Sequence, residues 1–135
     1  MGETVESGIV RGRPYGGVMI LVKDDLRGIT ETIVCEERYV IVKIGNPLIV
    51  NLYLPCKGTT GRLSFCEDII QDISSWRSRF CDFPCIVAGD FNCDFDCGDP
   101  VATCLNSFVE VWSLQRCDKL FPSYVTFTFV NSLNQ

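Results

Sequence analysis

The sequence of 135 residues contains no histidine. Serine-histidine-aspartate triads and cysteine-histidine pairs both use an imidazole as the general base, so both kinds of catalysis are excluded. Metal sites built on imidazole nitrogen are excluded for the same reason. The absence of one residue type therefore removes two large classes of hydrolase and one large class of metal site.

The sequence also lacks a long apolar run. Its longest apolar stretches, such as Gly16–Val22 and Leu48–Leu54, are far shorter than the ~20 residues that a membrane-spanning helix needs. The N-terminal residues MGETVESGIV are acidic and do not show the basic and then apolar order of a secretory signal. We therefore predict an intracellular chain with no membrane partner, and the sequence does not distinguish nucleus from cytoplasm.

Positive charge is scarce. Twelve lysine and arginine residues stand against 17 aspartate and glutamate residues, which gives a net charge of −5. This balance argues against a protein that coats a nucleic acid backbone by charge alone. It is compatible with an enzyme that meets phosphate through a bound metal ion, because the ion then supplies the positive charge.

Cysteine, by contrast, is abundant, with nine residues. The odd number and the absence of a secretory signal argue against a disulfide scaffold. One alternative is a zinc site formed by Cys81, Cys85, Cys93 and Cys97, although both three-residue spacers depart from the usual two-residue knuckle. The favoured interpretation is that most of the cysteines are reduced, small apolar side chains in or near a core.

Hydrophobic periodicity predicts one mixed α/β domain of layered strands and helices. Apolar residues spaced three and four apart predict helices over Gly61–Phe80 and Val101–Leu114. Two predicted strands, Thr30–Cys35 and Arg38–Ile44, are separated by Glu36 and Glu37 and are expected to pair antiparallel. The six predicted strands are Gly16–Val22, Thr30–Cys35, Arg38–Ile44, Leu48–Leu54, Cys85–Ala88 and Tyr124–Val130.

The strongest functional signal is the segment IVAGDFN, Ile86–Asn92. Asp90 and Asn92 are two residues apart at the end of a strand, so both can face a crevice beyond its carboxyl end. A carboxylate near an amide suits Mg²⁺ with phosphate oxygens, or the orientation and activation of a water molecule. The alternative is a strand-to-turn corner in which both side chains cap backbone groups. The residues alone leave both interpretations open.

A second polar pair lies at the end of another predicted strand, in the segment NLYLP. Asn51 and Tyr53 share one face of that strand, which places them well for the same crevice as Asp90. Taken alone, a tyrosine packed in the core with its hydroxyl group hydrogen-bonded is the more common arrangement.

Three motifs in this order and spacing, GRPYGGVMIL, NLYLPC and IVAGDFN, resemble the endonuclease/exonuclease/phosphatase superfamily. The resemblance is greatest to the endonuclease domain of non-LTR (LINE-type) retrotransposons. It covers residues 12–135, which we interpret as a partial domain that follows a polar N-terminal tail of residues 1–11. It implies a four-layer α/β sandwich like that of deoxyribonuclease I. The implied activity is Mg²⁺- or Mn²⁺-dependent hydrolysis of phosphodiester bonds, with DNA as the substrate.

The resemblance also implies roles for individual residues. Asp90 would orient or deprotonate the attacking water, and Asn92 would hold the phosphate or the metal shell, so both are candidate metal ligands. Tyr53 would lie against the scissile phosphate, with Asn51 supporting it. Thr126 and Thr128 resemble the strand that contacts substrate shortly before the last catalytic motif of the family.

The sequence departs from the family at both ends. In the family, an asparagine and a metal-binding glutamate precede the region that resembles GRPYGG, and Glu3 and Glu6 are poor substitutes for them. The family's final Ser-x-x-Asp-His motif is absent as well. We therefore expect a truncated domain with impaired activity, because charge stabilisation of the transition state would be weakened.

Truncation is expected to expose sheet edges that favour self-association, and no obligate protein partner is evident. The alternative function is a catalytically inactive remnant of the fold that acts as a binding module. A third hypothesis keeps the superfamily and takes a phosphoinositide or another small phosphoester as substrate, but the GRPYGG and NLYLPC motifs weigh against it.

Overall fold

The computed structural model describes residues 17–120. Its contacts divide the chain into two compact units, the first ending at Cys93 and the second beginning at Asp94. The predicted strand Tyr124–Val130, which includes Thr126 and Thr128, lies outside the described residues, as does the polar tail.

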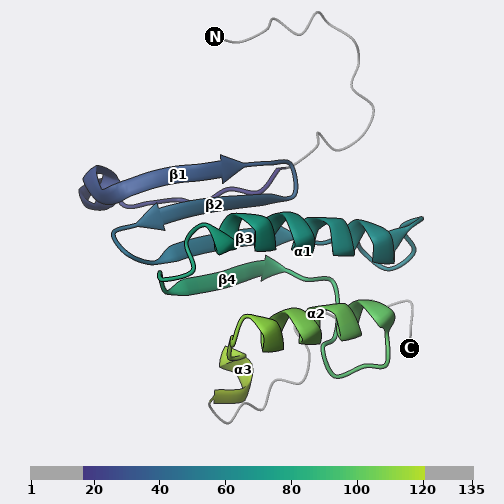
Figure 1. The fold of residues 1–135 in the computed structure, drawn as a ribbon. Helices are drawn as coiled ribbons and strands as arrows, with labels where there is room; N and C mark the ends of the chain where they lie inside the picture. Colours follow the sequence, from purple (N-terminus) through teal and green to yellow (C-terminus); the bar gives the residue numbers. More distant parts are fainter. Residues whose placement is uncertain (1–16, 121–135) are drawn as a thin grey trace, which may run out of the picture. The chain divides into compact units, whose positions relative to one another are not determined.

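A mixed four-stranded sheet and a long helix form the described part of the first unit (Figure 1). The spatial order of the strands is β1-β2-β3-β4, with β1–β3 antiparallel and β4 parallel to β3. A parallel pair needs a crossover connection, which the helix α1 supplies between β3 and β4. The predicted α/β class is therefore confirmed. The elements are β1 (Thr30–Cys35), β2 (Tyr39–Ile44), β3 (Leu48–Tyr53), α1 (Arg62–Ser78) and β4 (Cys85–Asp90).

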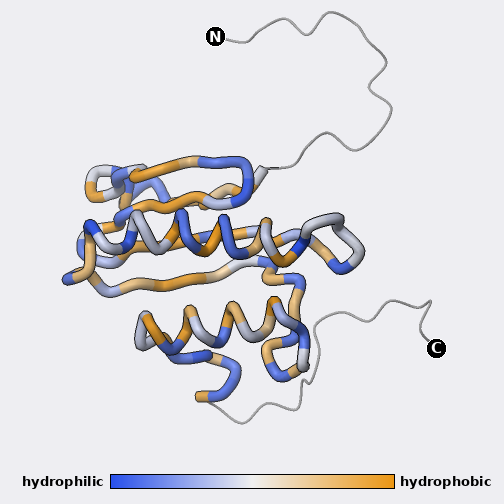
Figure 2. The backbone as a smooth tube through the Cα atoms, turned by 45° about the vertical axis from the view of Figure 1, so that its right-hand side comes forward, coloured by the Kyte–Doolittle hydropathy of each residue, from blue (hydrophilic) through white to orange (hydrophobic). Residues whose placement is uncertain are grey.

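The core of the first unit follows from the sequence pattern. The first four residues of β2 are buried on both faces, which is why they form a continuous apolar run. β3 alternates instead, with Leu48, Val50 and Leu52 buried on one face. Figure 2 shows that apolar residues follow the strands, whereas polar and apolar residues alternate along α1. The buried residues of α1 are spaced by three, one and three: Cys66, Ile69, Ile70 and Ile73.

One face of the sheet is covered by α1. The register pairs Tyr39 with Leu52, so these two side chains share a face. Tyr39 also reaches α1, where it is hydrogen-bonded to Trp76 and lies near Asp72. Burial, followed by the nearby Asp72 carboxylate, raises the pKa of Tyr39 above its ordinary value.

The described part of the second unit is helical. α2 (Pro100–Val111) begins after Asp99, whose side chain accepts a 2.9 Å hydrogen bond from the backbone nitrogen of Val101. This N-cap, with proline at the first helical position, explains where the helix starts. α2 ends three residues before the predicted boundary. It is followed by the single turn α3 (Cys117–Leu120), which is too short to be predicted from periodicity.

One prediction about the fold is wrong. Residues 17–22 form no strand, although GGVMILV has the composition of one. Met19 and Leu21 are 68% and 87% exposed, and the residue between them is only half-buried. The segment also makes no ladder of hydrogen bonds with the described sheet, and such a ladder defines a strand. It leads into a 3₁₀ helix, η1 (Asp24–Ile29), that the sequence analysis did not predict.

The cysteines lie only in part where they were predicted. All nine are within the described residues and are thiols, as predicted. Cys66 is buried and four others are half-buried, so five of the nine lie in or near a core. The remaining four are exposed: Cys35, Cys56, Cys81 and Cys117.

Candidate functional site

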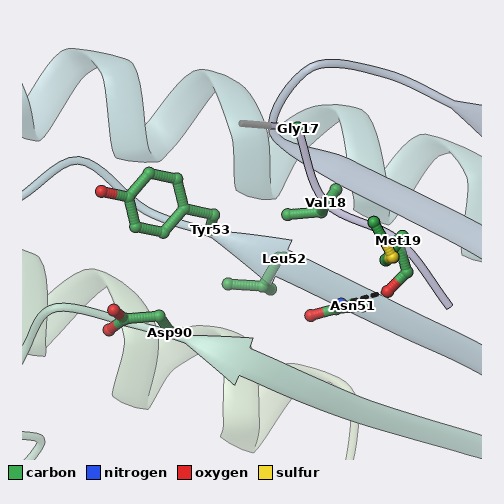
Figure 3. A pocket seen from close by; sticks show the side chains of 7 residues that line it. All are labelled: Gly17, Val18, Met19, Asn51, Leu52, Tyr53 and Asp90. Carbon is green, nitrogen blue, oxygen red and sulfur yellow. Dashed lines mark hydrogen bonds between the residues drawn. The ribbon is translucent and has the colours of Figure 1, made fainter. Parts of the chain in front are cut away.

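An open pocket of about 360 Å³ lies against the ends of β3 and β4 in the first unit. Figure 3 shows that it is lined from one side by the segment that precedes η1 and from the other by the two strands. Three of the residues predicted to form a site are brought together here. The lining residues are Gly17, Val18, Met19, Asn51, Leu52, Tyr53 and Asp90.

Strand pairing explains why these residues meet. In the parallel pair of β3 and β4, Tyr53 is the register partner of Asp90. Asn51 precedes Tyr53 by two residues and so lies on the same face of β3. Tyr53 is 36% exposed, so it is not the core tyrosine that the alternative interpretation described. Asp90 is also exposed and is the only charged residue among the described residues that line the pocket.

Asp90 begins a tight turn that fixes its carboxylate. Its Oδ1 atom accepts a 3.0 Å hydrogen bond from the backbone nitrogen of Asn92. Asn92 has a φ of 46°, a left-handed conformation that asparagine adopts more readily than most residues. The capping arrangement that the sequence left open is thus present. This hydrogen bond uses one acceptor site on Oδ1 of Asp90, and the carboxylate has further acceptor sites that can bind a ligand.

Asn92 itself is directed elsewhere. Its side-chain Nδ2 donates a 2.8 Å hydrogen bond to the carbonyl oxygen of Leu54, and Asn92 does not line the pocket. Arg62 reinforces this arrangement by donating to the carbonyl oxygens of Asn92 at 2.8 Å and Pro55 at 3.2 Å. Arg62 and Asn92 together tie the loop after β4 to the end of β3.

Gly89 lets the two strands approach each other at the site. Its φ is 138°, and a Cβ atom placed there would overlap the backbone oxygen of Leu52 and crowd Oδ1 of Asn51. Glycine is required at this position because both the conformation and the space exclude a side chain. This role of Gly89 could not be predicted from the sequence, because it depends on how closely β4 approaches β3.

Asn51 and Arg38 each contact a residue that lines the pocket. Asn51 Nδ2 donates a 2.8 Å hydrogen bond to the carbonyl oxygen of Met19, which holds the facing wall to the sheet (Figure 3). The guanidinium carbon of Arg38 lies 4.8 Å from the centroid of the Tyr53 ring and 5.1 Å from that of Phe65. Arg38 could not be predicted as part of the site, because a single arginine before an apolar run carries no distinctive signal.

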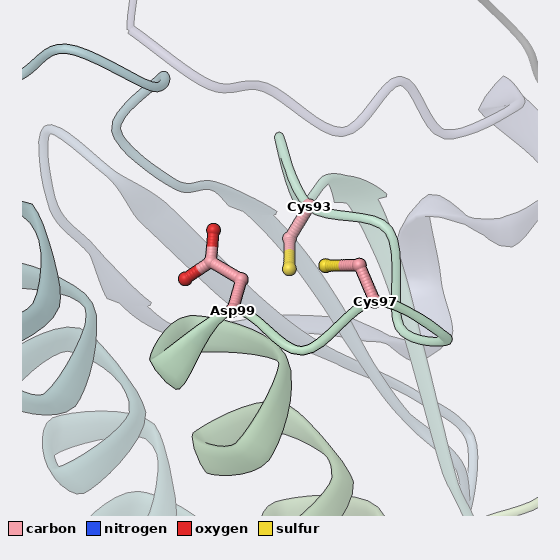
Figure 4. Close-up of side chains that lie close together, drawn as sticks. All are labelled: Cys93, Cys97 and Asp99. Atoms are coloured by element: carbon pink, nitrogen blue, oxygen red, sulfur yellow. The ribbon is translucent and has the colours of Figure 1, made fainter.

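One group of potential metal ligands occurs among residues 17–120, in the loop after β4. The ligand atoms of Cys93, Cys97 and Asp99 lie within 4.8 Å of one another (Figure 4). The group shares two members with the predicted zinc quartet but contains neither Cys81 nor Cys85. Its residues are divided between the two units, and thiolates are not the ligands that Mg²⁺ prefers. It therefore carries no argument about the pocket.

Comparisons with known proteins found no matching family model, no matching curated protein and no matching solved structure. Within residues 17–120, none of the helices combines the length and the apolar character needed to cross a membrane.

Proposed function

We propose that this chain is a divalent-metal-dependent phosphodiester hydrolase of the DNA endonuclease type, derived from a LINE-type retrotransposon and impaired in activity. The observation that carries the proposal is the position of Asp90 beside Tyr53 at the edge of an open pocket. A carboxylate and a phenol side by side offer the two functions that phosphodiester cleavage needs, an oxygen ligand or base and a hydrogen-bond donor for phosphate.

The donor set fits Mg²⁺ or Mn²⁺. Mg²⁺ is usually held by one or two carboxylates, with waters and substrate phosphate filling the remaining positions. Asp90 is exposed, and the cap from the backbone of Asn92 holds its orientation, so it offers one such ligand. When bound, the ion would supply positive charge and Lewis acidity, which the acidic pocket does not provide by itself.

The residues of the chain would divide the remaining work. Asp90 would also orient the attacking water, and Tyr53 would donate its hydroxyl proton in a hydrogen bond to a phosphate oxygen. Asn51 would support Asp90 and Tyr53 by holding the opposite wall of the pocket in place through its hydrogen bond to Met19. Asn92 would act on phosphate or metal only through its side-chain oxygen, because its Nδ2 donates to Leu54.

The finer fold and the substrate-contacting strand belong to the same proposal. A four-layer sandwich like that of deoxyribonuclease I would place a second sheet on the face opposite α1, where Ile86 of β4 is 55% exposed. By the same resemblance, Thr126 and Thr128, which lie outside the described residues, would contact DNA.

The exposure of Ile86 and the outer position of β4 in the described sheet also suit the alternative, an inactive remnant that binds a partner. An edge strand with unpaired backbone groups is a natural site for strand addition or self-association. Activity distinguishes the two proposals, because a binding module needs neither Asp90 nor a metal ion.

The test is nicking of supercoiled plasmid DNA with Mg²⁺, with Mn²⁺ and with chelator. Asp90→Asn keeps an oxygen that can accept the hydrogen bond from Asn92, so it removes the charge with little change in the turn. The matched control is Asp82→Asn, which removes an exposed carboxylate before the other end of β4.

We expect weak metal-dependent nicking that falls at least about 100-fold in Asp90→Asn, within the range that general acid–base catalysis contributes, and that is unchanged in Asp82→Asn. Folded protein that does not nick DNA with either metal ion would refute the hydrolase and leave the binding module. Nicking that survives Asp90→Asn would refute this site.

A further inference from the structure

Arg38 connects the pocket to the helix that covers the sheet. Its guanidinium group lies close to two aromatic rings from different elements, Tyr53 at the end of β3 and Phe65 in the first turn of α1. The backbone supports the same arrangement, since the nitrogen of Tyr53 donates a 2.8 Å hydrogen bond to the carbonyl oxygen of Arg38. Tyr53 is therefore held by both the main chain and the side chain of one residue.

The charge of Arg38 matters because of where it lies. Asp90 is the only charged residue among the described residues that line the pocket, and the whole chain has a net charge of −5. A phosphodiester entering the pocket would meet negative charge. Arg38 places a permanent positive charge against the ring of Tyr53, which is itself a lining residue.

We propose that Arg38 is a positioning residue for Tyr53 and a fixed positive charge that favours a phosphodiester in this pocket. This inference rests on the proposed function. A guanidinium group attracts the face of an aromatic ring and still has N–H groups at its edge that can donate to phosphate oxygens. Lysine would retain the charge but would lose the planar contact with the ring.

The experiment uses the full chain labelled with 3-fluorotyrosine. The chain has four tyrosines, and the ¹⁹F signal of Tyr53 is assigned by its loss in Tyr53→Phe. The probe is a thymidine dinucleotide, which contains one phosphodiester, titrated in the presence of Mg²⁺. The variants are Arg38→Gln and Arg38→Lys.

The matched control is Arg79→Gln. The guanidinium carbon of Arg79 lies 4.7 Å from the centroid of the Trp76 ring, after the last residue of α1. This control loses the same charge and the same kind of ring contact as Arg38→Gln. It leaves Tyr53 and the pocket intact.

In the free protein, we expect Arg38→Gln to shift the ¹⁹F signal of Tyr53 and Arg79→Gln to leave it in place. Affinity for the dinucleotide should fall about tenfold in Arg38→Gln, as expected for the loss of one hydrogen bond to a charged group. In Arg38→Lys it should fall by less, since the charge remains. If Arg38→Gln does not fold, Arg38→Lys decides the positioning role, because it should shift the signal of free Tyr53.

Two results separate the inference from the proposed function. If the dinucleotide binds to the original chain and Arg38→Gln changes neither its affinity nor the signal of free Tyr53, the inference is refuted alone. If the dinucleotide does not bind to the original chain, the proposed function is refuted together with the inference.

Discussion

The two faces of β3 and β4 differ sharply. On the face covered by α1, Leu48 and Leu52 are 1% and 0% exposed. On the opposite face, Tyr53 is 36% exposed and Ile86 is 55% exposed, and Asp90 is exposed as well. Residues one position apart along the same strand therefore have opposite environments.

The comparison shows how one strand can serve two purposes. Alternation along a strand assigns successive side chains to opposite faces, so the apolar residues form a core while the polar residues remain available to a ligand. The chemistry of the candidate site therefore depends on packing that it does not touch.

The largest effect is expected from truncating a core residue on the covered face. Leu52→Ala should lower the free energy of unfolding by about 3–5 kcal/mol, because it removes buried methyl groups and leaves a cavity. Ile86→Ala on the open face should cost less than about 1 kcal/mol, since more than half of the side chain is already in water. Urea denaturation of both variants measures this difference. Equal losses would mean that both faces are buried.

A large effect is also expected from Gly89→Ala, because the backbone of β4 lies very close to that of β3 at this residue. The added Cβ meets backbone rather than a flexible side chain, and φ is unfavourable. Strain and overpacking together should cost about 3 kcal/mol. Gly28→Ala is the control, because nothing lies within 4 Å of a Cβ there. A harmless Gly89→Ala would contradict the tight approach of β4 to β3.

A smaller effect is expected from Arg62→Met, which keeps the apolar stem and removes the donors to Pro55 and Asn92. Loss of these bonds should lower the free energy of unfolding by about 2 kcal/mol. Because the turn that carries Asp90 is held by the same contacts, the affinity for Mn²⁺ should fall too. Calorimetry measures both, and Arg27→Met, which removes an exposed arginine from η1, should change neither. Unchanged stability in Arg62→Met would mean that the loops do not need this arginine.

Much of the first unit was predictable because burial and periodicity agree. The continuous apolar run of β2, the alternation of β3 and the spacing of α1 each fit one arrangement, and the structure has it. Alternation along a strand also predicted that Asn51 and Tyr53 would face the same crevice as Asp90, and all three line the pocket. The parallel pairing of β3 with β4 was not predicted. The local sequence pattern was sufficient to predict these elements because the apolar residues that define each pattern are the ones that the structure buries.

The remaining features depend on partners that a local pattern does not reveal. Residues 17–22 have the composition of a strand, but they form no ladder with the described sheet. The orientation of Asn92 depends on Leu54 and Arg62, which lie 38 and 30 positions away in the sequence. Arg38 lies against Phe65, so its contact could not be predicted without knowing how α1 packs on the sheet.

The smallest effect, and the one confined to alkaline pH, concerns Tyr39 on the covered face. Its pKa is raised by burial and by Asp72, so the folded state favours the protonated phenol more than the unfolded state does. The contribution to stability is complete below the unfolded pKa, near 10.0, and is lost as the pH rises through the higher folded value. Tyr39→Phe should therefore flatten the fall in stability above pH ~10. Urea denaturation of Tyr39→Phe and of the original chain between pH 8 and pH 11 measures both slopes, and equal slopes would mean that Tyr39 does not lie in the buried environment described.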